Sequence, residues 1–216
     1  MIKIFIFDQN LLPTVSGIEN AFGFGKAESE RLLAMKSNSR RTESASALAA
    51  LAQLTDITHG GARPTLKRLS DGKPCFEDST LSLSLAHSHG ISVAAVCDGG
   101  ELGIDLELIR EHRDRDALAK RFFSSSELDE LEKSEDKTTD FFRIWTEKEA
   151  FSKMTGKGLT SVISSDETDP NAEISSFVFY NGNDAYSLSI CTTSKNINVE
   201  FYNNLSNLKF AKRNKK

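Results

Sequence analysis

The sequence of 216 residues lacks the features of a membrane-spanning or secreted protein. It has no run of 18 apolar residues, the length that a membrane-spanning helix needs. The first apolar stretch is short and is interrupted by Asp8, whereas a secretory signal peptide has a longer apolar region and a small-residue cleavage site. The three cysteines, Cys75, Cys97 and Cys191, are far apart and odd in number, so they predict no disulfide framework. We expect a cytoplasmic protein in which each cysteine is a small apolar filler.

The chain also lacks an excess of positive charge. Its 27 lysine and arginine residues are outnumbered by 31 aspartate and glutamate residues, which gives a net charge of −4. Bulk charge therefore argues against a nucleic-acid partner. A local exception is the basic segment from Lys209 to Lys216, which we expect to be a frayed, solvated end. With 38% hydrophobic and 27% charged residues, the composition is globular and excludes a fibrous or disordered chain.

The order of the predicted elements is that of an α+β protein with two halves that meet near residue 100. In the first half, residue patterns predict strands at 2–7, 81–85 and 91–97 and helices at 28–35 and 41–54. In the second half, they predict a strand at 102–109, helices at 117–123, 124–133 and 139–154, and three strands of an antiparallel sheet at 174–180, 186–191 and 197–201. Asp98-Gly99-Gly100 predicts a hairpin turn that leads into the strand at 102–109.

The strand at 102–109 carries the first candidate residues for chemistry. Aliphatic residues alternate there with Gly103, Asp105 and Glu107, so the two carboxylates share the face opposite the aliphatic side chains. Two like charges two residues apart repel each other unless a cation or a basic side chain lies between them. The alternative interpretation is an ordinary solvated strand face with surface acids.

A later helix carries the second group of candidates. Trp145, Glu149 and Lys153 are spaced i, i+4 and i+8, so they form one row along this helix. If Glu149 faces Asp105 and Glu107, three carboxylates converge, and such hard oxygen donors suit Mg²⁺. Lys153 would then lie one turn away, within reach of a phosphate oxygen. The alternative is an amphipathic helix with a surface Glu149–Lys153 pair, which contributes roughly 0.3–0.5 kcal/mol.

The histidines and aromatic residues give weaker evidence for a functional site. His87 and His89 form a His-x-His pair that suits zinc, but the other histidines, His59 and His112, fall in predicted loops. Surface or core histidines are therefore the default interpretation. The phenylalanines of the later helix predict core packing, whereas Trp145 fits either the core or the wall of a site.

Two segments together resemble the two-part signature of the 4′-phosphopantetheinyl transferases. The first is GIDLE at 103–107, and the second, some forty residues later, is WTEKEAFSK at 145–153. The resemblance covers roughly residues 70–160 and hardly touches the last 50 residues. Four shorter segments resemble the larger, surfactin-synthetase-activating type of the family. RFFS at 121–124 and GKGL at 156–159 lie where that type has such residues. GKP at 72–74 resembles its coenzyme A loop, and AHSHG at 86–90 resembles its SHS motif.

The resemblance implies an enzyme that transfers the phosphopantetheine arm of coenzyme A to a serine of a carrier protein and releases adenosine 3′,5′-bisphosphate. It implies that Asp105, Glu107 and Glu149 hold Mg²⁺ on the pyrophosphate. Glu149 would also help to deprotonate the serine, directly or through a water. Lys153 would stabilise the phosphate charge or protonate the leaving group, and Lys148 would lie near the substrate.

By the same resemblance, cationic side chains meet the 3′-phosphate of coenzyme A. Lys73 and His87 occupy the family's positions for this task. The family has serine directly before this histidine, whereas this chain has Ala86, so one hydroxyl donor is missing. Ser88 or a backbone N–H is expected to compensate.

The implied fold is a pseudo-dimer of two similar α/β halves that acts as a monomer, with coenzyme A between the halves. Residues 1–100 would hold the 3′-phosphate and adenine side, where Arg41, our choice over Arg40, adds a basic group. Residues 101–216 would hold the metal and the catalytic groups. The implied partner is an acidic, helical carrier protein, with no membrane or nucleic acid involved. A basic rim for docking would be formed by Arg110, Arg113, Arg115, Lys120 and Arg121, for which the alternative interpretation is a solvated basic loop and helix.

Two other functions compete with the transferase. A Mg²⁺-dependent hydrolase of nucleotides or phosphoesters would use the same acidic cluster with water as the nucleophile. A non-catalytic relative would bind coenzyme A or carrier proteins without transfer, which Ala86 alone favours. The sequence leaves open whether the natural carrier serves fatty-acid, polyketide or peptide synthesis, whether acyl-coenzyme A is accepted, whether Mg²⁺ or Mn²⁺ is preferred, and what the basic tail does.

Overall fold

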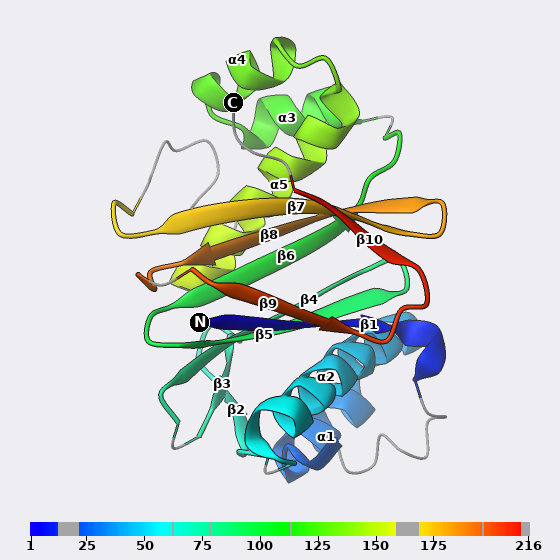
Figure 1. Ribbon diagram of the computed structural model, residues 1–216, viewed down its shortest axis with the longest axis vertical. Helices are drawn as coiled ribbons and strands as arrows, with labels where there is room; N and C mark the ends of the chain where they lie inside the picture. The colour runs from blue at the N-terminus through cyan, green and yellow to red at the C-terminus, as the bar shows by residue number, and fades with distance from the viewer. Residues whose placement is uncertain are drawn as a thin grey trace. The chain divides into compact units, whose positions relative to one another are not determined.

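The computed structural model describes residues 1–12, 22–61, 63–77, 79–112, 114–158, 169–195 and 197–212 (Figure 1). The chain forms two compact units. The first comprises Met1–Leu102 with Ser194–Leu205, and the second comprises Gly103–Thr193 with the residues from Ser206 onward. Each unit has a four-stranded sheet and its own helices, so the predicted α+β class is confirmed.

The first unit has a mixed sheet with strand order β4-β5-β1-β9, in which β1 is antiparallel to β5 and parallel to β9. Strands β2 and β3 form a separate antiparallel ribbon. The elements of this unit are β1 (Ile2–Asp8), the 3₁₀ helix η1 (Gln9–Leu11), α1 (Lys26–Ala34), α2 (Asn38–His59), β2 (Leu66–Arg68), β3 (Pro74–Phe76), β4 (Leu81–Ser88), β5 (Ile91–Asp98) and β9 (Val199–Asn203).

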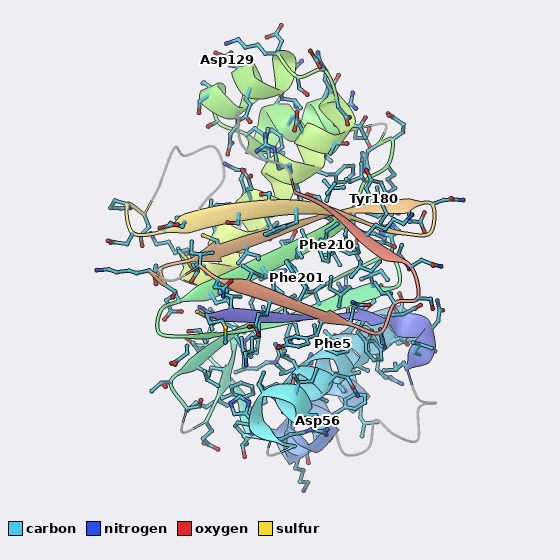
Figure 2. The ribbon with its side chains drawn as sticks, viewed as in Figure 1. Phe5, Asp56, Asp129, Tyr180, Phe201 and Phe210 are labelled. Carbon is cyan, nitrogen blue, oxygen red and sulfur yellow. The ribbon has the colours of Figure 1, made fainter. Side chains whose placement is uncertain are left out.

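Helix α2 buries its alanine- and leucine-rich face against this sheet. It begins after Ser37, whose hydroxyl accepts the Arg40 N–H at 3.4 Å, and it ends at Gly60, which takes a left-handed conformation with φ of 61°. Leu48 and Leu51 are fully buried in a core that includes Phe5 of β1. Figure 2 shows Phe5 between β1 and α2. Burial of this apolar face, rather than helix propensity alone, holds α2 in place.

The second unit also has a four-stranded sheet with a long helix packed on it, and its strand order is β10-β7-β8-β6. Its long helix packs on β7 and β8 and ends at Gly156, where φ is 68°. The capping box predicted from Ser124 and Glu127 is present at the start of the middle helix. The elements are β6 (Leu102–Leu108), α3 (Arg115–Phe122), α4 (Ser125–Glu132), α5 (Lys137–Thr155), β7 (Glu173–Asn181), β8 (Asp184–Thr192) and β10 (Leu208–Lys212).

The two units share one connectivity. In each, a first strand leads through a long helix to a β-hairpin whose second strand lies beside the first strand. The strands concerned are β4-β5-β1 in the first unit and β7-β8-β6 in the second, with one further edge strand in each sheet. Two similar α/β halves are therefore present, whereas the pseudo-dimer stays a prediction.

Three local predictions were wrong. The strand predicted at 197–201 is β9, and it pairs in parallel with β1 instead of joining the antiparallel sheet of the second unit. The third antiparallel strand of that sheet is β10, which pairs with β7, so the basic tail is not frayed from Lys209 to Lys212. Asp98-Gly99-Gly100 is not a hairpin turn, because β5 and β6 belong to different sheets. Alternating residues indicate a strand, but they do not indicate its partner.

The cysteines agree with their predicted role as apolar fillers. All three are free, with Cys97 and Cys191 buried and Cys75 partly buried. Burial raises the pKa of the Cys191 thiol to about 12, so this thiol stays protonated and inert. Among the residues described, no helix is both long enough and apolar enough to cross a membrane.

Candidate active site

Strand β6 presents its acidic face to α5 rather than to solvent. Asp105 is buried, with 7% of its surface exposed, and Glu107 is partly buried. Gly103 lies on the same face, and a Cβ atom at this position would come within 2.0 Å of the Ala150 carbonyl oxygen and 2.4 Å of the Met154 nitrogen. Only glycine lets the α5 backbone approach β6 this closely. The interpretation as a solvated strand face is therefore wrong.

Glu149 of α5 lies close enough to both β6 carboxylates for their charges to act on it. Partial burial is the largest cause that raises the pKa of Glu149 to about 7. The charge of Asp105 raises it further, Lys153 lowers it, and Glu107 is the last of the causes that raise it. The structure therefore places Glu149 within electrostatic range of Asp105 and Glu107. A carboxyl with a pKa of about 7 can accept or donate a proton near neutral pH.

Lys153 is the cation of this cluster. Its Nζ donates to Asp105 Oδ1 at 2.7 Å, and it also lowers the pKa of Glu149. The predicted Glu149–Lys153 row along α5 is thus turned towards β6. This charge-assisted contact compensates part of the cost of burying Asp105.

The donor chemistry of the three carboxylates fits a magnesium ion, which prefers hard oxygen ligands. The grouping itself is not preformed. Within the described ranges, no set of three or more histidine, cysteine, aspartate or glutamate side chains is arranged so that it could hold a metal ion. Lys153 lies on Asp105 instead, so a cation at this position would have to replace or share that contact.

Lys148, predicted to lie near the substrate, is held by α4. Its Nζ donates to Glu127 at 3.1 and 2.9 Å, and only 7% of the lysine is exposed. The same Glu127 carboxylate accepts the Ser124 N–H at 2.7 Å in the capping box. In this structure Lys148 therefore joins α5 to the first turn of α4.

His87 lies near the end of β4, in the first unit. Its ring nitrogen Nδ1 is 3.8 Å from a carboxylate oxygen of Glu43 on α2. His89 and Gly90 form the two-residue turn to β5, with φ values of 44° and 84° as a type I′ turn requires. His87 and His89 are thus divided between a strand and a turn, and the residues described include no third ligand that would complete a zinc site with them.

The serine that the family places before this histidine would not lie beside it. Ala86 is buried and His87 exposed, because successive strand residues face opposite sides of the sheet. Ser88 is buried on the same side as Ala86, and its Oγ contacts His89 Nδ1 at 3.0 Å. The hydroxyl that Ala86 lacks would therefore lie on the buried side of β4, opposite the side on which His87 lies.

The other predicted coenzyme A residues also belong to the first unit. Lys73, in the turn between β2 and β3, donates to Glu101 at 2.7 Å. The backbone of this turn is anchored by Arg68, which donates to the Gly72 carbonyl at 3.1 Å and pairs with the buried Glu28 of α1. Arg41 donates to the Met35 carbonyl at 2.5 Å, which ties the start of α2 to the end of α1.

The proposed basic rim is only partly available. Arg110, Lys120 and Arg121 are exposed, and Arg121 lies over the Phe122 ring at 5.1 Å. Arg115 is mostly buried and contacts Glu111, Asp116 and Thr138. Arg113 lies outside the described residues, as does Leu159 of the GKGL segment.

Trp145 packs with the aromatic core of α3 and α5. Its ring meets Phe122 edge-on at 5.3 Å and stacks on Phe141 at 6.1 Å. Phe141 and Phe151 are buried as predicted. Trp145 therefore supports α5 by packing.

Sequence reasoning missed the residues that support the acidic cluster. Gly103 was placed on the acidic strand face and in a motif, but its close approach to α5 was not predicted, although a glycine inside a strand is a known sign of such an approach. Thr146 and Arg143 are buried and hydrogen-bonded across elements. No pattern in one sequence distinguishes such residues from ordinary surface positions of a helix.

The fold and this site define a mixed α/β protein with a partly buried cluster of three carboxylates and a lysine between one strand and one helix. Residues 101–202 match the family model of the 4′-phosphopantetheinyl transferase superfamily. Over 147 residues, the chain is 34% identical to the 4′-phosphopantetheinyl transferase AcpT of Salmonella typhi, and the match covers 66% of this chain and 70% of that protein.

Two shorter matches involve other transferases. The chain is 41% identical over 99 residues to the 4′-phosphopantetheinyl transferase HetI of Nostoc, covering 43% of this chain and 42% of that protein. It is 40% identical over 92 residues to the 4′-phosphopantetheinyl transferase Sfp of Bacillus subtilis, covering 41% and 40%. The chain thus spans less than half the length of these two relatives. It belongs to the 4′-phosphopantetheinyl transferase superfamily, as its two signature segments predicted.

Proposed function

We propose that this protein transfers the 4′-phosphopantetheine group of coenzyme A to a serine of an apo carrier protein. The observation that carries the proposal is the proximity of Glu149 to Asp105, Glu107 and Lys153. Family membership supports it, and the segments RFFS, GKGL, GKP and AHSHG are our reason to assign the chain to the larger type of the family. The reaction releases adenosine 3′,5′-bisphosphate.

Each member of the cluster has a proposed task. Asp105, Glu107 and Glu149 would hold Mg²⁺, which would neutralise charge on the pyrophosphate of coenzyme A. Glu149 would also help to accept the proton of the carrier serine, directly or through a water. Lys153 stabilises the charge of the departing phosphate or protonates it.

The first unit is proposed to hold coenzyme A. Lys73 and His87, with Arg41 and Ser88, meet its 3′-phosphate, because a phosphate is best bound by several cations and hydrogen-bond donors. Lys73 would exchange Glu101 for the phosphate. Lys148 would act near the substrate only after leaving Glu127. An acidic carrier protein would dock at Arg110, Lys120 and Arg121, which are exposed.

The test is a transfer assay read by intact mass. The protein is incubated with coenzyme A, Mg²⁺ and several apo carrier proteins, and each carrier is expected to gain the mass of one phosphopantetheine group. Asp105→Ala should reduce the rate at least ~100-fold, because it removes a proposed metal ligand and the partner of Lys153. Asp129→Ala, an exposed aspartate of α4 shown in Figure 2, is the matched control and should act like the wild type.

The competing functions give different results in the same experiment. A hydrolase would cleave coenzyme A with no carrier present and leave every carrier unmodified. A non-catalytic relative would bind coenzyme A in calorimetry but modify no carrier. Full activity of Asp105→Ala would remove the metal assignment while leaving the transfer activity standing.

A further inference from the structure

Buried hydroxyl groups fasten α5 to the sheet of the second unit. Thr146 has no exposed surface, and its Oγ1 lies 3.0 Å from Ser187 Oγ and 2.7 Å from Ser189 Oγ, both on β8. Ser176 of β7 extends the group, with its Oγ 3.0 Å from Ser189 Oγ. We call Thr146, Ser176, Ser187 and Ser189 the hydroxyl cluster.

The hydroxyl cluster continues into a charged network on α5. Ser176 Oγ donates to Glu147 Oε1 at 2.7 Å, and Glu147 accepts both 3.1 Å hydrogen bonds from Arg143. Arg143 also pairs with Asp140 of α5 and with Glu130 of α4. The same hydrogen-bonded set therefore reaches α4, α5, β7 and β8.

This polar contact has a consequence that apolar packing alone would not have. Apolar burial is non-directional, so it constrains the rotation of a helix only through the shapes of the packed side chains. Hydrogen bonds between buried groups are directional and are costly to leave unmade, so they select one rotation. Thr146 precedes Glu149 by three residues on the same helix. A contact that fixes the rotation of α5 at Thr146 therefore also fixes the direction in which Glu149 leaves the helix. Strand β8 is also the neighbour of β6, which carries Asp105 and Glu107.

We propose that the hydroxyl cluster sets the rotation of α5 and so holds Glu149 against Asp105 and Glu107, which makes Thr146 a positioning residue of the transfer reaction. This inference rests on the proposed function. Thr146 itself touches no reacting group. Its effect passes through the direction in which Glu149 and Lys153 point.

A pair of substitutions separates the hydroxyl from the shape of the side chain. Thr146→Val keeps the shape and removes the hydroxyl, whereas Thr146→Ser keeps the hydroxyl and removes a methyl group. Transfer rates are measured at saturating carrier and varied coenzyme A. Thr146→Val should lower kcat about tenfold or more, since small misplacement of a reacting group is costly. The KM for coenzyme A should stay within about twofold, because the proposed 3′-phosphate ligands belong to the first unit.

Thr146→Ser should recover most of the lost kcat. The matched control is Ile190→Val, which changes the next residue of β8 on its opposite face and should keep wild-type kcat. Circular dichroism and thermal unfolding verify that the variants are folded. If Thr146→Val fails to fold, Ser189→Ala replaces it, with the same loss of kcat expected.

Three results would overturn the proposal: full kcat in folded Thr146→Val or its replacement, an equal loss in Thr146→Ser and Thr146→Val, or a loss confined to the KM for coenzyme A. An inactive wild-type protein would instead contradict the proposed function. The two failures are therefore distinguishable.

Discussion

The pKa of Glu149 is subject to two opposing influences. Burial and the two β6 carboxylates favour its protonated form, while Lys153 favours its ionised form. The first group prevails, which raises its pKa to about 7. A surface glutamate of an amphipathic helix would have no such conflict, so this residue is the most informative titrating group of the cluster.

This conflict predicts a pH-dependent stability. Between the ordinary glutamate value of 4.5 and about 7, the folded state binds more protons at Glu149 than the unfolded state does, so stability falls as pH rises. Glu149→Gln removes this loss, because glutamine does not ionise. The variant should match the wild type near pH 4 and exceed its free energy of unfolding by about 2 kcal/mol at pH 8, allowing for partial exposure.

Urea denaturation from pH 4 to pH 8 in the presence of a chelator measures this difference, since a bound cation would oppose it. Glu132→Gln, at an exposed position of α4, is the control and should leave the pH dependence unchanged. Parallel curves for Glu149→Gln and the wild type would show that Glu149 does not titrate differently in the folded state.

At the scale of elements, the site depends on how closely β6 and α5 approach each other. Gly103 contributes nothing to the chemistry, yet it sets this approach, because the space for its Cβ atom is already taken by α5 backbone atoms. The carboxylates of β6 and the charged row of α5 are near each other as a result. The close approach of α5 thus explains why the GIDLE segment has glycine at position 103.

Gly103→Ala should therefore separate the two elements. We expect a loss of about 1–3 kcal/mol in the free energy of unfolding, at the upper end because backbone atoms cannot rotate away. The transfer rate should also fall, as Glu149 moves away from Asp105. Ile104→Val, on the other face of the strand, should cost about 0.5–1.5 kcal/mol with little change in rate. Wild-type stability of Gly103→Ala would contradict the close packing.

Residue patterns were sufficient for the elements but not for their partners. The helix predicted at 139–154 is present as Lys137–Thr155, because its apolar spacing and terminal glycine are local signals. The placement of Asp105 and Glu107 on one strand face, and of Glu149 and Lys153 in one helix row, was likewise predictable from periodicity, and Lys153 contacts Asp105. The hydroxyl cluster was not predictable, because serines of β7 and β8 meet Thr146 only through tertiary packing.

At the scale of the whole molecule, the last part of the chain serves both units. Strand β9 pairs with β1 of the first unit over five residue pairs, from Ile2↔Val199 to Ile6↔Asn203. The chain then returns to the second unit, where β10 pairs with β7 from Leu208↔Asn181 to Lys212↔Phe177. Each unit therefore completes its sheet with a strand supplied late in the sequence.

Two truncations separate these contributions. Ending the chain after Leu205 removes β10 alone, and ending it after Thr193 removes both β9 and β10. Hydrogen exchange measured by mass spectrometry should then show faster exchange in β7 for both truncations, because β7 loses its outer hydrogen-bonded neighbour. Faster exchange in β1 should occur only after truncation at Thr193, which leaves one edge of β1 unpaired. If protection of β1 is unchanged in the chain that ends at Thr193, β9 contributes little to the first sheet. If β1 loses protection when β10 alone is removed, the two sheets unfold together.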